Sequence, residues 1–232
     1  MRYLVIGAAG HAQEVAWSLR EQLNARSDDG ELIFFDDGLA TGPVASGLGM
    51  IVGGLDTVAT HAAGMASRLV LGIGLPKVKR SVAERLSRLG VPWATVIHPR
   101  AIIGANVSIG EGSYVGAGAI ITVNVHIGRF ATVNMHCQVA HDDVLESFVT
   151  LHPDVHLSGN VTVREGAELG TGAIVIPGVD VGAWATLGAG CVAVKSLAGD
   201  QAYVGLPARP LERQPRAEDR NSEIPTEHRR VR

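Results

Sequence analysis

An aliphatic residue recurs at every sixth position through the middle of this chain of 232 residues. The recurrence has no gap over residues 97–187, and the position two residues before each aliphatic is small or β-branched, with Asp143 as the exception. The aliphatic positions are Ile97, Ile103, Ile109, Val115, Ile121, Ile127, Val133, Val139, Leu145, Leu151, Leu157, Val163, Leu169, Val175, Val181 and Leu187. A period of six fits neither an amphipathic helix nor an alternating strand. It is typical of a hexapeptide parallel β-helix.

The repeat also predicts how the coils stack. Each hexad forms one short side, so three hexads complete a triangular coil of 18 residues, and neighbouring coils bury the aliphatic ladder between them. We expect about five coils over residues 97–187, with no loop extruded from the prism. Cys137 and Cys191 fall on the small inward position, which favours packing over chemistry.

The segment before the repeat alternates predicted strands and helices. Residues 3–6 predict a buried strand, followed by a glycine turn and a helix; "LIFFDDG" and "RLVLGIG" predict two more strands, and "VKRSVAERLSRLG" a second helix. Such alternation is typical of a small parallel sheet, which binds ligands at the carboxyl ends of its strands. The candidate substrate-binding residues at those ends are Gly7, Ala8, Ala9, Gly10, His11, Asp36, Asp37, Gly72 and Gly74.

These strand ends leave two alternatives open. Ala9 stands where a dinucleotide fingerprint has its second glycine, so the first turn is consistent with nucleotide binding or with a tight structural turn. Asp36 and Asp37 could each bind a base edge or cap a turn.

Composition excludes several classes of function. A net charge of −3 and the lack of basic blocks interleaved with aromatics argue against nucleic acid. No apolar run reaches the length of a membrane span, and the two cysteines form no disulfide framework or zinc-type pair, so we expect a cytoplasmic protein. Residues 212–232 are charged and lack a hydrophobic period, which predicts a flexible tail.

Histidines cluster in the middle of the repeat, at His136, His141, His152 and His156. Asp142 follows His141, and a carboxylate bonded to one ring nitrogen would fix the tautomer and leave the other nitrogen free as a general base. One coil later, Gly159 could present a bare backbone N–H to a developing oxyanion. The alternative is a solvated histidine at a corner of the prism.

A metal site is a rival interpretation. The spacing of His136 and His141 is similar to that of two zinc histidines in γ-class carbonic anhydrases. Arg100 stands where the third ligand is expected, and a cation there opposes Zn²⁺. His98 and His152 keep this alternative open.

Six motifs spread over residues 3–211 carry a family resemblance. They are "GAAGH", "FFDD", "LGIGLPKVKRSVAERL", "VNMHCQVAHDDV", "LSGNV" and "VGLPARPL". With them the chain resembles the sialic acid O-acyltransferase-like family of β-helix sugar acyltransferases, which includes nucleotide-sugar N-acetyltransferases for bacillosamine and perosamine. The resemblance implies a small N-terminal α/β Rossmann-like domain (residues 1–90) that binds a nucleotide sugar, and a left-handed parallel β-helix of hexapeptide repeats (residues 91–211).

The resemblance also implies roles for single residues. His141 would be the general base, Asp142 would orient it, Asn134 would contact the acceptor, and the Gly159 N–H would face the thioester. No metal would be needed. Acetyl-CoA would lie in the groove between subunits of a homotrimer, against Gly159, Thr171, Gly188, Ala189 and Pro207.

We therefore expect an acetyl-CoA-dependent N-acetyltransferase that acts on the amine of a nucleotide-linked amino sugar, with a 4-amino sugar favoured. A sugar O-acetyltransferase and a non-catalytic β-helix subunit are the alternatives. Two departures from the family, Thr150 in place of a histidine and Gly74-Leu75 in place of asparagines, leave the acceptor contacts and the nucleotide base open.

Overall fold

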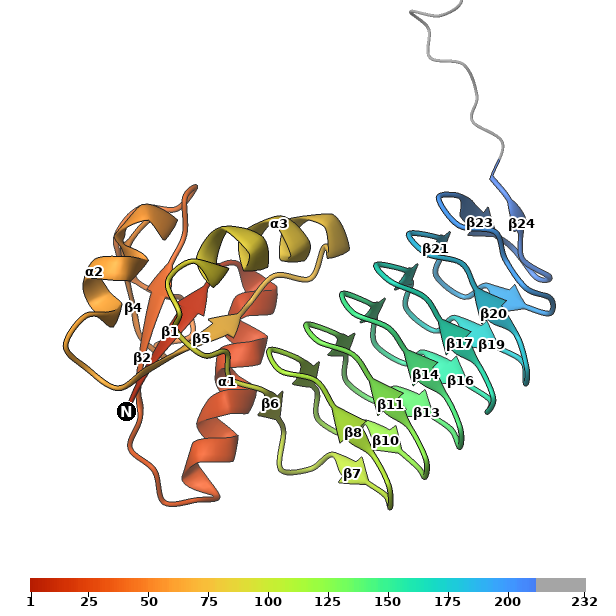
Figure 1. Cartoon of the computed structure of the whole chain (residues 1–232), viewed down its shortest axis with the longest axis horizontal. Coiled ribbons are helices and arrows are strands. Elements are labelled where there is room, and N and C mark those ends of the chain that lie inside the picture. Colours follow the sequence, from red (N-terminus) through yellow and green to blue (C-terminus); the bar gives the residue numbers. More distant parts are fainter. Residues whose placement is uncertain (212–232) are drawn as a thin grey trace, which may run out of the picture.

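The computed structural model describes residues 1–211, which form an α/β domain followed by a long three-sided prism of short strands (Figure 1). The tail predicted at residues 212–232 lies outside the described residues. Within residues 1–211, no helix combines the length and the apolar character that a bilayer crossing requires.

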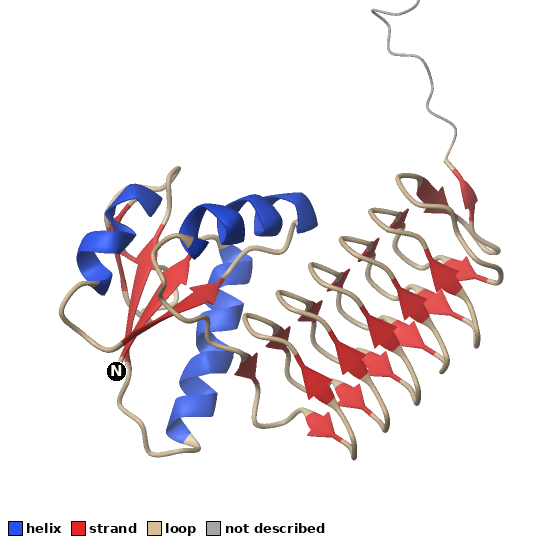
Figure 2. Cartoon of the chain, viewed as in Figure 1, coloured by secondary structure: helices blue, strands red, loops and turns tan. Residues whose placement is uncertain are grey.

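The α/β domain is built on one twisted sheet with helices on both faces (Figure 2). Its strands are β1 (Arg2–Ile6), β2 (Glu31–Phe35), β3 (Gly42–Pro43), β4 (Met50–Gly53) and β5 (Ser67–Leu71), in the order β3-β4-β2-β1-β5. All neighbours are parallel except β3 and β4. The helices are α1 (Gly10–Asn24), a 3₁₀ turn η1 (Leu55–Thr57), α2 (Val58–Ala62) and α3 (Pro76–Ser87).

Alternation along β1 divides this domain into two cores. Val5 packs towards α1, whereas Leu4 and Ile6 pack with α2 and α3. A central strand buried on both faces has to be apolar throughout, which is why residues 3–6 contain no charge. The three strands and two helices predicted for this segment are present; β3, β4, η1 and α2 were not predicted.

In the prism, a two-residue strand starts every six residues from β6 (Val96–Ile97) onwards, without an insertion. The later strands are β7 (Ile102–Ile103), β8 (Ser108–Ile109), β9 (Tyr114–Val115), β10 (Ile120–Ile121), β11 (His126–Ile127), β12 (Thr132–Val133), β13 (Gln138–Val139), β14 (Val144–Leu145), β15 (Thr150–Leu151), β16 (His156–Leu157), β17 (Thr162–Val163), β18 (Glu168–Leu169), β19 (Ile174–Val175), β20 (Asp180–Val181), β21 (Thr186–Leu187) and β22 (Val192–Ala193). The chain then closes the prism with β23 (Ala202–Val204) and β24 (Arg209–Pro210). The predicted parallel β-helix is confirmed, and it continues beyond residue 187.

Three sheets form the faces of the prism. The eight-stranded face contains β6, β9, β12, β15, β18, β21, β23 and β24; the six-stranded face contains β7, β10, β13, β16, β19 and β22; the third face contains β8, β11, β14, β17 and β20. Each strand pairs with the strand one coil later, as in Ile120 with Gln138, so residues 18 apart stand in one column.

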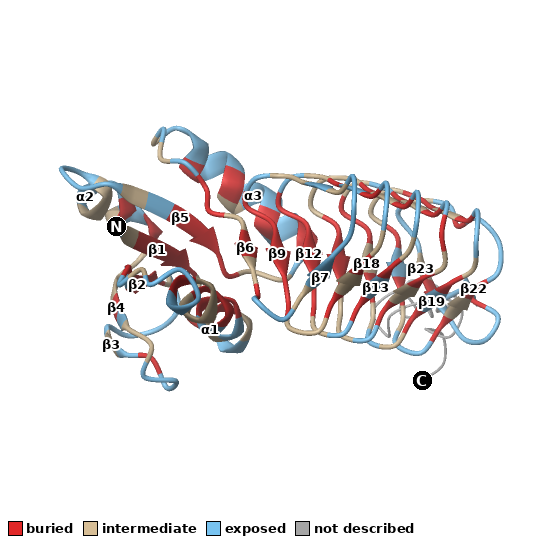
Figure 3. Ribbon diagram, turned by 90° about the horizontal axis from the view of Figure 1, so that it is seen from below, coloured by how far each residue is buried: buried red, intermediate tan, exposed pale blue. Residues whose placement is uncertain are grey.

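The aliphatic ladder fills the interior. Figure 3 shows the buried residues recurring along the coils of the prism. Side chains from Val115 onwards are fully buried, whereas Ile103 in the first coil is 37% exposed. Ile103 lies on the terminal strand of the six-stranded face, with no coil in front of it. The ladder is therefore a core only where coils lie on both sides.

The α/β domain rests on the start of the eight-stranded face. Ser18 Oγ lies 3.1 Å from the Tyr114 hydroxyl, and Thr150 Oγ1 donates to the Gly74 carbonyl at 2.7 Å. Thr150 and Gly74, the positions at which the chain departs from the family pattern, are thus hydrogen-bonded to each other where the domains meet.

Candidate active site

His141 and Asp142 form a hydrogen-bonded pair at the corner that joins the six-stranded face to the third face. His141 Nδ1 and Asp142 Oδ2 are 2.8 Å apart, and both side chains are about half exposed. Asp142 has a left-handed backbone with φ +62°, and Asn124 Nδ2 donates to its Oδ1 at 3.1 Å. These two bonds, from His141 first and Asn124 second, lower the pKa of Asp142. The carboxylate therefore holds one ring nitrogen and leaves Nε2 open.

Gly159 lies directly beside that open nitrogen. It is one coil further along the same corner, where the Asn160 N–H donates to the His141 carbonyl at 3.0 Å. A Cβ at Gly159 would stand 2.9 Å from His141 Nε2 and 3.0 Å from Cε1. Gly159 also has φ +100°, so both its backbone and the space around it require glycine.

Asp143, the exception in the inward positions, is completely buried next to this pair. Its carboxylate accepts the N–H groups of Ala140 and Val161, each at 2.8 Å. Burial raises its pKa to about 6, partly offset by these bonds. The sequence marked Asp143 as unusual but suggested no role for it.

A second concave region lies at the carboxyl ends of β1, β2 and β5. A cavity of about 370 Å³ is lined by the predicted residues Gly7, Ala9, His11, Asp36, Asp37, Gly72 and Gly74, together with Gly38, Leu55, Ile73, Leu75, Val78 and Val82. The predicted Ala8 is buried behind the turn, and Gly10 begins α1. All the predicted strand-end residues except Ala8 and Gly10 thus line one pocket.

Both aspartates of the pocket bind backbone. Asp36 accepts the N–H groups of Ala8, Gly38 and, at 3.1 Å, Leu39. Asp37 Oδ1 accepts the Leu55 N–H at 2.7 Å. Both carboxylates therefore cap turns, and binding of a base edge by either one stays a prediction.

His11 lies where the pocket meets the prism. Its ring is edge-to-face with Tyr114, at 5.8 Å between centroids, and it packs against Gly74. Burial lowers its pKa, opposed by Glu14. Within residues 1–211 its buried Nε2 has no hydrogen-bond partner, so a neutral imidazole faces this junction with one nitrogen unused.

The remaining predicted residues lie on a different corner from His141. Asn134 is buried at the corner between the eight-stranded and six-stranded faces, and Thr171, Gly188 and Ala189 follow along this corner. Pro207 is exposed in the turn between β23 and β24. One chain therefore places the predicted base and most of the predicted acetyl-CoA contacts on opposite edges of the six-stranded face.

Comparison with known proteins decides the family. The chain is 30% identical over 182 residues to the GDP-perosamine N-acetyltransferase of Escherichia coli O157:H7, a match that covers 76% of this chain and 79% of that protein. The chain belongs to the hexapeptide-repeat family of nucleotide-sugar N-acetyltransferases. No family model matches the chain.

Solved structures of this family agree. A perosamine N-acetyltransferase from Caulobacter crescentus, in a form with one histidine replaced by asparagine and in complex with CoA and GDP-perosamine, is 31% identical with a TM-score of 0.81, over 92% of this chain and 98% of that one. WeeI from Acinetobacter baumannii AYE is 29% identical with a TM-score of 0.82, over 91% and 100% of the two chains. The predicted resemblance is confirmed: the chain is an acyltransferase, and acetyl-CoA is its co-substrate.

The other reactive side chains of this acyltransferase are buried or paired with carboxylates. Both cysteines are buried, and burial raises the pKa of Cys137 to about 12, so it carries no thiolate at neutral pH. His136 lies 3.6 Å from Asp154, and His152 Nε2 lies 2.8 Å from Glu168. No three His, Cys, Asp or Glu side chains of residues 1–211 are grouped as metal ligands.

Proposed function

We propose that this chain transfers the acetyl group of acetyl-CoA to the amine of a nucleotide-linked amino sugar, with a 4-amino sugar favoured, and that His141 is the general base. The observation that carries the proposal is the position of His141, held through Nδ1 by Asp142 while Nε2 lies against the bare Cα of Gly159. A base in this position can accept a proton from a substrate above the corner.

The reaction proceeds by direct attack in a ternary complex. The amine nitrogen forms a bond to the thioester carbonyl carbon as its proton passes to His141 Nε2; the C–S bond then breaks, and the thiolate of CoA takes up that proton. The Gly159 N–H stabilises the oxyanion. Since burial keeps Cys137 protonated, an acyl-enzyme on this thiol is not expected.

The nucleotide occupies the cavity at the strand ends, in a Rossmann-like domain of residues 1–90, and the left-handed β-helix of residues 91–211 supplies the chemistry. His11 lies at the junction of the two, on the side where the sugar would leave the cavity, and Asn134 would contact the acceptor. The Caulobacter protein is described with GDP-perosamine and CoA bound while a histidine is replaced, which supports a nucleotide-linked substrate and makes a GDP sugar the first to test.

A homotrimer completes the site. The outward column of the six-stranded face contains Ile102 and Ile120 at one end, Ile174 and Val192 at the other, and Gln138 and His156 between them. Closed symmetry that turns these faces towards one axis brings the His141 edge of one subunit to the Asn134 edge of the next. Acetyl-CoA then lies between one subunit's Gly159 and the other's Thr171, Gly188, Ala189 and Pro207.

The deciding experiment measures free-thiol release from acetyl-CoA with UDP-, GDP- and dTDP-linked 4-amino sugars, with mass spectrometry of each product. We expect one acetyl on nitrogen with a single nucleotide, and a loss of at least about 100-fold in kcat in His141→Ala, with unchanged binding of both substrates by calorimetry. A hydroxylamine-labile ester product would show an O-acetyltransferase instead. Native turnover by His141→Ala would rule out this base.

A further inference from the structure

The ladder of hydrogen bonds between coils is interrupted at one step, beside His141. Along this corner, the N–H that follows each strand of the six-stranded face normally donates to a carbonyl of the next coil. The bonds present are Gly104 to Ile121 at 2.8 Å, Thr122 to Val139 at 3.0 Å, Ser158 to Val175 at 3.1 Å and Ile176 to Ala193 at 3.2 Å. At Ala140 the equivalent acceptor is Leu157, but the Ala140 N–H donates to Asp143 Oδ2 at 2.8 Å.

The same ladder is intact at the other two corners. There, Asn134 donates to Leu151 and Glu146 to Val163, at 3.1 and 2.8 Å. Within the described part of the prism, the interruption is thus confined to the coil that carries His141. It coincides with Asp143, the inward residue that departs from the repeat.

The second oxygen of Asp143 reaches the next coil. It accepts the Val161 N–H at 2.8 Å, two residues after Gly159. One carboxylate therefore binds the residue before His141 and the chain just beyond Gly159. Both segments of the candidate site are tied to the same buried group.

Packing alone does not explain a carboxylate at this position. The inward column through residue 143 otherwise contains Val107, Val125, Val161 and Val179. Asp143 is fully buried in this column of valines, where a carboxyl group is less favourable than an aliphatic side chain of similar volume. A residue that the core disfavours points to a role at the corner.

We propose that Asp143 is a positioning residue for acetyl transfer: it takes the place of the Ala140–Leu157 ladder bond and so sets the separation between the His141 imidazole and the Gly159 backbone. The inference rests on the proposed roles of His141 and Gly159. A ladder bond would draw Ala140 towards Leu157 and shift the imidazole that follows it. Displacements of about 1 Å are enough to cost on the order of 100-fold in rate.

Asp143→Val tests the proposal, because valine is what the column otherwise contains. We expect its crystal structure to show the Ala140 N–H bonded to the Leu157 carbonyl. We expect kcat to fall about 10- to 100-fold, with KM for both substrates within about threefold and Tm equal to or above the native value. Asp143→Asn, which retains one acceptor, should give an intermediate kcat. Val107→Ala, two coils earlier in the column, should lower Tm and leave kcat unchanged.

Two results would overturn the inference. One is native kcat in Asp143→Val; the other is a parallel loss of Tm and kcat in both Asp143 variants, which would make the residue merely structural. The variant His141→Ala distinguishes a failure of the positioning role of Asp143 from a failure of the proposed function. If His141→Ala keeps native turnover, the base is wrong, and a crystal structure of Asp143→Val without the Ala140–Leu157 bond would then refute the positioning role as well.

Discussion

The proposed chemistry of His141 depends on Gly159, which lies one coil further along the prism and has no side chain. The open Nε2 faces Gly159, and any Cβ there would lie 2.9 Å from it. The carboxylate of Asp142 holds the other nitrogen, so the ring cannot rotate away without breaking that bond. Orientation of the base and access to its free nitrogen are thus controlled by two different residues.

Gly159→Ala should therefore impair the site directly. The added methyl meets the imidazole, and alanine at φ +100° is strained, so we expect kcat to fall by about 10- to 100-fold and the free energy of unfolding by about 1 kcal/mol. Steady-state kinetics and urea denaturation measure the two effects. Gly64→Ala is the control, because Gly64 has φ +74° and open space around it. An equal loss of kcat in both variants would show that contact with His141 is irrelevant.

Sequence was sufficient to place His141, Asp142 and Gly159 together. The period fixes which residues share a corner, and 18 residues separate His141 from Gly159. The sequence did not reveal that Asp143 accepts the N–H groups of Ala140 and Val161. Local geometry, which the period does not encode, decides whether a backbone N–H leaves the hydrogen-bond ladder between coils. A periodic pattern shows that a residue is exceptional without showing its partners.

Among the elements, α3 joins the two domains through a buried lysine. Lys79 Nζ donates to Thr132 Oγ1 at 3.2 Å and to the Val149 carbonyl at 3.0 Å, and the Thr150–Gly74 bond lies nearby. Burial lowers the pKa of Lys79 to about 7. The docking of the α/β domain on the prism thus includes a group that titrates near neutral pH.

Lys79→Met should change how stability depends on pH. Because the folded pKa is about 7 and the ordinary value 10.5, the unfolded chain binds more protons between these values, and the native protein gains stability as pH rises through this window. The methionine variant lacks this gain. We expect its free energy of unfolding, relative to native protein, to fall by roughly 2 kcal/mol from pH 7 to pH 9 in urea titrations.

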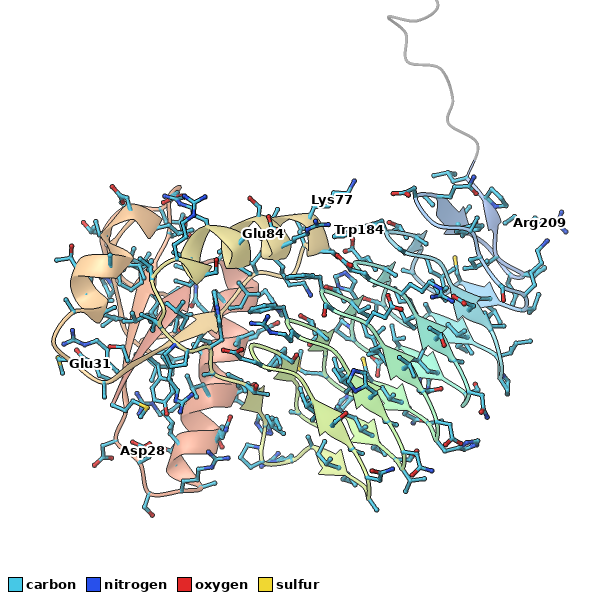
Figure 4. All side chains as sticks on the ribbon, in the orientation of Figure 1. Asp28, Glu31, Lys77, Glu84, Trp184 and Arg209 are labelled. Carbon is cyan, nitrogen blue, oxygen red and sulfur yellow. The ribbon has the colours of Figure 1, made fainter. Side chains whose placement is uncertain are left out.

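Lys77→Met is the matched control. Lys77 projects from the same helix into solvent (Figure 4). A difference for Lys79→Met that stays constant with pH, or one that Lys77→Met reproduces, would contradict the burial of a titrating amine between the domains.

Sequence predicted the helix α3 but not that one of its lysines is buried. A lysine in such a helix is usually solvated, and its burial follows from how two domains dock, which no local pattern encodes. The short strands β3 and β4 and the helix α2 were missed for a related reason. They are too short to show a period, and tertiary packing determines them.

At the scale of the whole molecule, the proposed active site depends on which edges of the six-stranded face carry its residues. His141 and Asn134 occupy opposite edges of the six-stranded face of one chain. The proposed homotrimer combines them between neighbours. Each active site then takes one corner from each of two subunits.

Complementation of two inactive variants tests this arrangement. When His141→Ala and Asn134→Ala are unfolded together and refolded as mixed trimers, a site with native His141 and native Asn134 forms at roughly one interface in four. We therefore expect up to about a quarter of native activity to return, measured by thiol release. Each variant refolded alone is the control. No recovery in mixed trimers, with mixing verified by native mass spectrometry, would place both residues in the same subunit's site.

The unbroken 18-residue spacing also limits how such a chain can change its length. Duplication or loss of one full coil leaves every later residue on its original face and shifts it only along the axis of the prism. An insertion of six residues within the prism instead rotates everything that follows by one face, and an insertion of one residue turns the ladder outwards. A change by whole coils therefore keeps both edges that the proposed trimer brings together on their original sides of the prism, so one coil is the smallest unit by which this fold can lengthen without turning either edge away.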